Sequence, residues 1–246
     1  MVRPTRAQLL VKGLAARIAA IDAEALATTL LAGVETAATS RWEAAVERAA
    51  ALPGDVRPEK IRALSTMFAK ELGAVGAAAG MAVATPLVGT GTTLMVATVE
   101  LSWFTARAGD LILTIAALHG HPTPTVDERR AWVLAVLIFG GSARQSMTGV
   151  ANRMGAGLSD ASPTPLSMAT LRATNRAMSH FVLRRYGARR GAIALCTALP
   201  LGIGAVVGSS ANVVAIRNLA VQADSFFSRL PYSSIEATST AVAGLL

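Results

Sequence analysis

The sequence has little of several residue types that define common protein classes. It holds one cysteine, Cys196, so no disulfide can form within the chain and a cysteine-based zinc site is nearly excluded. Aromatic residues make up only 4% of the 246 residues and charged residues 15%, whereas 52% are hydrophobic, which excludes intrinsic disorder. Because alanine and leucine supply much of the apolar content and favour helices, we predict an all-α protein.

The predicted fold is one compact helical bundle with Gly/Ala-rich apolar hairpins in its core. No internal repeat and no alternating strand pattern appears along the chain. We expect residues 1–57 to form N-terminal helices packing on the core, residues 58–230 to form the main helical domain, and residues 231–246 to be a flexible tail.

Helix signals place the main elements of this domain. Pro58 marks the first turn of a helix, because proline is favoured there. Apolar spacing predicts further helices at about 35–52, 94–118, 128–150 and 167–187, and a Gly/Ser/Pro-rich loop at 153–166.

Two long runs, residues 72–99 and 191–216, contain no charged residue. About 20 apolar residues can span a bilayer, but the first run gains only about −2 to −4 kcal/mol from its large apolar residues. Five glycines between residues 72 and 91, together with Pro86, work against insertion. The small-residue pairs Gly76/Gly80 and Gly204/Gly208 favour close helix packing instead, so we predict buried hairpins rather than fixed membrane spans.

Positive charge is concentrated in the second half of the chain. Residues 129–217 carry eleven basic side chains and a single acidic one, Asp160. Such asymmetry indicates an anionic partner, either a phospholipid membrane or nucleic acid. Nucleic acid fits poorly, because residues 144–190 interleave only Phe181 and Tyr186 with the arginines and show no recognised DNA-binding motif.

The helix at 167–187 is the clearest basic element. Its basic residues step by four along one side, and Met168, Leu171, Met178, Phe181 and Val182 are predicted on the other. The membrane-binding residues predicted here are Arg172, Arg176, Arg184, Arg185, Arg189 and Arg190. Four arginines at about 1 kcal/mol each give only about millimolar affinity. Some apolar insertion would have to help, and the alternative is an ordinary solvated face.

A polar stripe follows the helix at 94–118. Glu100, Arg107 and Asp110 lie within about 80° of one another on a helical wheel, and the rest of this helix is apolar. With Asn212 they could form the polar floor of an apolar pocket for a lipid or similar amphiphile. The alternative is a structural ion network, because buried charges must be paired.

Catalytic and metal-binding signatures are scarce. His119 and His121 have the spacing of two zinc ligands but would need Asp127 or Glu128 to complete a site. The chain has no Gly-x-Ser-x-Gly motif, and Gly89-Thr-Gly-Thr-Thr has no lysine for a phosphate loop. We therefore predict no catalytic residue, no metal and no cofactor.

Three stretches resemble the EcsC family of bacterial proteins over about residues 60–230. They are the run from Glu71 to Gly80, the helix from Asp110 to Gly120, and the Pro/Gly-rich run from Leu199 to Asn212 that continues to Phe227. Where the family often has Tyr-Gly, this chain has His119-Gly120. The resemblance implies a helical, membrane-related protein and carries over no catalytic residue.

These observations predict a non-enzymatic protein that docks on the cytoplasmic face of the bacterial membrane and holds a lipid or amphiphile. No secretion signal follows the basic N-terminus, because Lys12, Arg17 and Asp22 interrupt the apolar residues. Two alternatives stay open. One is an interaction module that regulates a membrane transporter by binding its subunits, and the other is an enzyme acting on lipids.

Overall fold

The computed structural model describes residues 23–83, 90–121, 124–153, 167–186 and 208–230, and all regular structure among them is helical. This confirms the all-α prediction for the described part of the chain. The elements in chain order are α2 (Ala23–Ser40), α3 (Trp42–Ala51), α4 (Arg57–Val83), α5 (Thr90–Leu118), α6 (Val126–Phe139), the 3₁₀ turn η1 (Gly140–Ser142), α7 (Ala143–Arg153), α8 (Met168–Tyr186) and α10 (Gly208–Phe227).

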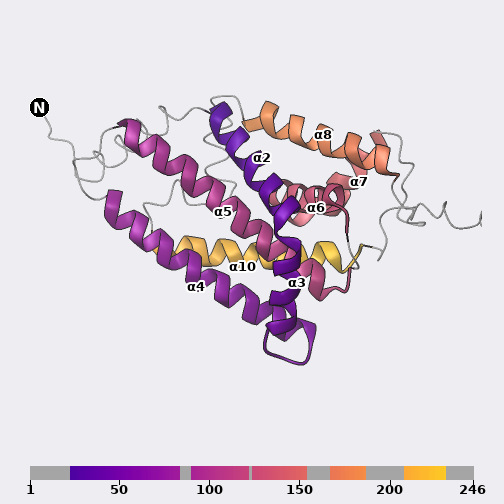
Figure 1. The fold of residues 1–246 in the computed structure, drawn as a ribbon, viewed down its shortest axis with the longest axis horizontal. Helices are drawn as coiled ribbons and strands as arrows, with labels where there is room; N and C mark the ends of the chain where they lie inside the picture. The colour runs from indigo at the N-terminus through magenta and orange to yellow at the C-terminus, as the bar shows by residue number, and fades with distance from the viewer. Residues whose placement is uncertain (1–22, 84–89, 122–123, 154–166, 187–207, 231–246) are drawn as a thin grey trace, which may run out of the picture.

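Helix α5 organises the bundle. It lies between α2 on one side and the pair α4 and α10 on the other, as Figure 1 shows. Helix α3 packs across α5, and α8 packs against α6 and α7 along the upper edge of the view. Both described N-terminal helices, α2 and α3, thus pack on α5.

The core is built around the second half of α5 and around α6. Residues 111–116 of α5 and residues 131–137 of α6 are all buried. A helix that is apolar on every side can only be stable when neighbours cover every side. The stretch from Ala131 to Leu137 meets this condition because α2, α5, α8 and α10 all pack against α6.

Helices α2 and α5 approach closely because each has a glycine at their contact. A Cβ atom on Gly33 would lie 2.7 Å from the Cβ of Thr105, and one on Gly109 would overlap the Cβ of Ala37. Removing the side chain lets two helix backbones pack tightly. The sequence did not predict this contact, since the predicted close packing involved Gly76/Gly80 and Gly204/Gly208 instead.

Two predicted helices are divided in the structure. The helix expected at 128–150 ends at Phe139, because Gly140 adopts a φ of 51° and a 3₁₀ turn follows before α7 begins. The helix expected at 35–52 is broken at Arg41 between α2 and α3. Hydroxyls of Thr36, Thr39 and Ser40 bond back to carbonyls of the last turns of α2, a pattern that bends helices.

Other predicted boundaries agree with the structure. Helix α4 begins at Arg57, next to Pro58, and α5 ends at Leu118 as expected. A capping box starts α6: Thr125 accepts a hydrogen bond from the Glu128 amide, and the Glu128 carboxylate accepts one from the Thr125 amide.

The first uncharged run forms the end of one long helix and the start of another, since α4 reaches Val83 and α5 begins at Thr90. Among the described residues, no helix is both long enough and apolar enough to cross a bilayer. The loop predicted at 153–166 apart from Arg153, the tail at 231–246 and residues 191–207 of the second uncharged run lie outside the described residues.

The close contact between α2 and α5 makes a stability prediction. Gly109→Ala should lower the free energy of unfolding by about 1–3 kcal/mol, because the new methyl group overlaps Ala37. The matched control is Gly149→Ala in α7, where a Cβ would meet nothing within 4 Å. That variant should gain up to about 1 kcal/mol from helix propensity. Urea unfolding measures both, and equal effects of the two variants would contradict the predicted packing.

Candidate functional site

Helix α8 presents its basic residues to solvent. Arg172, Arg176, His180 and Arg184 are all exposed, whereas Leu171, Met178 and Val182 on the opposite side are buried. The period of 3.6 residues per turn places residues four apart on one side of the helix. The predicted separation of the basic side from the buried side is therefore seen for these residues.

No acidic residue interrupts this surface within its own helices. The sequences of α7 and α8 contain no aspartate and no glutamate, and the two helices pack against each other (Figure 1). Arg153 at the end of α7 is exposed as well. We call Arg153, Arg172, Arg176 and Arg184 the basic face.

Arg172 of the basic face also forms an ion pair that links α8 to α6. Asp127 of α6 accepts hydrogen bonds from Arg172 Nε at 3.0 Å and from Arg130 Nη1 at 2.6 Å. Arg130 in turn donates twice to Glu35 of α2, both at 2.7 Å, and these bonds raise its pKa. Arg172 is thus partly neutralised, whereas Arg176 and Arg184 pair with no carboxylate of the described residues.

Phe181 differs from the prediction. It was expected on the buried side of α8, but its side chain is 37% exposed and its ring centre lies 5.5 Å from that of Phe139. Three residues after the buried Met178 and three before the exposed Arg184, it lies about 60° from each around the helix, at the border between the two sides. An aromatic side chain therefore flanks the basic face.

The remaining predicted membrane contacts lie outside what the structure describes. Arg185 belongs to α8, but the position of its side chain is not described, and Arg189 and Arg190 lie beyond the helix.

The polar stripe of α5 is partly an ion network. The Arg107 guanidinium donates to Asp110 Oδ2 at 2.6 Å and to Glu71 of α4, and Asp110 is fully buried. Burial alone would lower the pKa of Arg107, but the hydrogen bonds to both carboxylates outweigh it and raise this pKa. Arg107 and Asp110 are thus brought together as predicted, whereas the side chains of Glu100 and Asn212 lie outside the described residues.

Tertiary packing adds residues that sequence analysis missed. Arg48 of α3 donates to Thr114 Oγ1 at 3.0 Å, and Arg41 approaches Asp110 Oδ2 to 3.9 Å. The guanidinium carbons of Arg48 and Arg107 lie 5.6 and 4.7 Å from the centre of the Phe68 ring. We call Arg41, Arg48, Glu71, Arg107 and Asp110 the arginine cluster. Arg107 and Asp110 are the part of this cluster that the sequence predicted, and among the added members the spacing of seven between Arg41 and Arg48 is the one local pattern.

The two histidines near the end of α5 have structural contacts. His119 Nε2 lies 2.8 Å from Asp224 Oδ1 of α10, and the His121 ring packs between Trp132 and Phe227. Among the described residues, no three His, Cys, Asp or Glu side chains come together as metal ligands. Burial lowers the pKa of His119 and Arg57 lowers it further, against the opposing hydrogen bond to Asp224.

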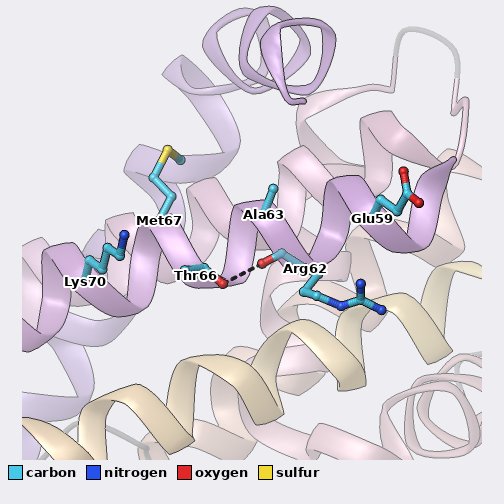
Figure 2. Close-up of a pocket in the computed structure, with 6 residues that line it drawn as sticks. All are labelled: Glu59, Arg62, Ala63, Thr66, Met67 and Lys70. Atoms are coloured by element: carbon cyan, nitrogen blue, oxygen red, sulfur yellow. Dashed lines mark hydrogen bonds between the residues drawn. The ribbon is translucent and has the colours of Figure 1, made fainter. Parts of the chain in front are cut away.

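A shallow groove runs along the outer side of α4. Figure 2 shows its six lining residues at helical spacing on this one helix: Glu59, Arg62, Ala63, Thr66, Met67 and Lys70. The Thr66 hydroxyl donates to the Arg62 carbonyl rather than pointing a free donor into the groove. Polar groups from several elements do not converge here, so the groove lacks the character of a ligand site.

The ion network predicts a large effect of one carboxylate. Asp110→Asn should lower the free energy of unfolding by about 3 kcal/mol or more, because it removes the buried carboxylate that Arg107 shares with Glu71 and leaves three arginines facing one carboxylate. Glu35→Gln removes a carboxylate from the more exposed pair with Arg130 and should cost less than about 1 kcal/mol. Chemical denaturation at neutral pH measures both, and a similar small loss in both would contradict a buried, paired Asp110.

His119 predicts a pH effect. Its folded-state pKa lies below the ordinary value of 6.5, so the unfolded chain takes up the proton first as the pH falls. The free energy of unfolding should therefore drop as the pH falls through the ordinary value of 6.5. His119→Gln should flatten this dependence, whereas His180→Gln, at an exposed position, should keep it. Unchanged pH dependence in His119→Gln would refute this assignment.

Comparison with known proteins gives no further constraint on this site. No family model, no curated protein and no solved structure matches the chain.

Proposed function

We propose that the protein docks peripherally on an anionic phospholipid membrane through the basic face. The supporting observation is the row of exposed arginines on α8, in a pair of helices that contain no acidic residue. Arginine forks bind phosphate oxygens in pairs, and lipid headgroups present phosphates as a dense layer. A face of one charge sign, in which Arg172 is paired with Asp127 but Arg176 and Arg184 pair with no described carboxylate, is suited to such a layer.

The strength of this docking follows from the contacts of each residue. Arg153, Arg176 and Arg184 contribute about 1 kcal/mol each, and Arg172 contributes less because it is already paired with Asp127. Burying the exposed third of Phe181 in the interface adds about 1 kcal/mol. The total of about 4 kcal/mol corresponds to roughly millimolar affinity, so docking is reversible and weakened by salt.

The proposal also includes a location on the cytoplasmic face of the membrane, a relationship to the EcsC family and the binding of an amphiphile. The ligand has the least support, because Arg107 and Asp110 bond to each other and to Glu71 instead of facing a lipid. A protein partner such as a transporter subunit is the alternative occupant of the basic face.

Vesicle co-sedimentation tests the docking. The protein should bind vesicles containing phosphatidylglycerol, bind neutral phosphatidylcholine vesicles much less, and dissociate at high salt. The double variant Arg176→Glu/Arg184→Glu should lose at least about tenfold in affinity, because two attractive charges become repulsive.

The matched control for this experiment reverses two charges elsewhere. Arg62→Glu/Lys70→Glu changes net charge equally on exposed positions of α4 and should retain binding. Equal, negligible binding of the wild type to both vesicle types would refute the proposal. An equal loss in both double variants would show that net charge, not the basic face, is responsible.

A further inference from the structure

We infer that Arg41 and Arg48 of the arginine cluster bind the phosphate group of a small soluble ligand. This goes beyond the proposed membrane docking, because α3 and α8 lie on different sides of the bundle (Figure 1). A bilayer lying against α7 and α8 would not reach the cluster. Three features of the cluster support this inference: its net charge, the hydrogen bonds of its arginines, and the spacing of Arg41 and Arg48 along the chain.

The cluster has one positive charge in excess. Three guanidinium groups face two carboxylates, and Arg107 bonds to both Glu71 and Asp110. Arg41 comes no nearer to a carboxylate of the described residues than 3.9 Å, and Arg48 has none within 4.0 Å. Asp110, which is already bonded to Arg107, is thus the one carboxylate of the described residues that lies close to Arg41, and Arg48 has no carboxylate of its own there.

Arg48 is the clearest case of an arginine that lacks a paired carboxylate among the described residues. It is half-buried, and the one side-chain hydrogen bond it makes with the described residues goes to a neutral hydroxyl, that of Thr114. Thr114 in turn donates to the carbonyl of Asp110, so its hydroxyl is already fixed in direction. A desolvated cation without a paired anion is unfavourable, and a bound anion would correct this.

Arg41 gives the site its opening to solvent. Its side chain is 40% exposed and makes no hydrogen bond with the described residues. Seven residues separate it from Arg48, which places both on the same side of the chain two turns apart. Both face α5, where Asp110 and Thr114 are one turn apart. The two guanidinium groups thus border one stretch of α5.

The chemistry of two nearly unused guanidinium groups favours phosphate. Each group presents a planar fork of N–H donors that matches a pair of oxygens. A carboxylate has two oxygens and satisfies one fork, whereas a terminal phosphate offers three and up to two negative charges. A phosphate therefore uses both arginines and neutralises the excess charge.

Calorimetric titration with inorganic phosphate, at ionic strength held constant with chloride, tests this site. The wild type should show saturable binding, and Arg48→Gln and Arg41→Gln should each weaken it by about tenfold or more. Arg176→Gln removes the same charge from the basic face and should leave phosphate affinity unchanged. Without phosphate, Arg48→Gln should melt no lower than the wild type, because an unpaired cation is removed.

Several outcomes would overturn the inference. These are no saturable binding by the wild type, unchanged affinity in Arg48→Gln, or equal weakening in Arg48→Gln and Arg176→Gln. A vesicle arm separates the sources of phosphate. If binding to phosphatidic acid vesicles depends on Arg48, the ligand is a headgroup and the soluble ligand is wrong. If that binding depends on Arg176 alone, membrane docking and the phosphate site are independent, as inferred.

Discussion

Every charge that α5 carries into the bundle has to meet a partner there, and this constraint fixes how α3, α4 and α5 come together. Asp110 is fully buried, so its carboxylate requires Arg107, and Arg107 reaches across to Glu71 of α4. Phe68 lies beneath two of the guanidinium groups. These contacts leave little freedom in the angle and register at which the three helices pack.

The interior elsewhere depends on small side chains. Gly33 and Gly109 bring α2 against α5. Three alanines of α2 and two of α6 are buried, namely Ala27, Ala37, Ala38, Ala131 and Ala135. Close packing of this kind replaces the aromatic bulk that the composition lacks. One small aromatic cluster, of Trp132, Phe226 and Phe227, lies where α6 and α10 meet.

Acidic and basic residues serve different purposes in this bundle. Glu35, Glu71, Asp110 and Asp127 all bond to arginines within the protein. Arginines that have no carboxylate partner in the described part of the chain include Arg176 and Arg184 of the basic face and Arg48 of the arginine cluster. These two settings differ, since the arginines of the basic face form an exposed row and Arg48 is half-buried between helices. A layer of headgroups suits the first, and a small anion suits the second.

The sequence by itself determined the helical class, the start of α4, the end of α5 and the two sides of α8, because these follow from propensity and a period of 3.6 residues. It also determined that Arg107 and Asp110 lie together, since they are one turn apart. Only the tertiary structure decided that Glu71, Arg41 and Arg48 join them, that Asp127 holds Arg172, and that Gly33 and Gly109 allow α2 to meet α5. The residues of each pair are far apart along the chain, and no local sequence pattern predicts which helices pack against each other. The helix breaks at Arg41 and Gly140 were also not determined by the sequence. The apolar spacing of a helix continues through both positions, so only the folded structure shows that the helices end there.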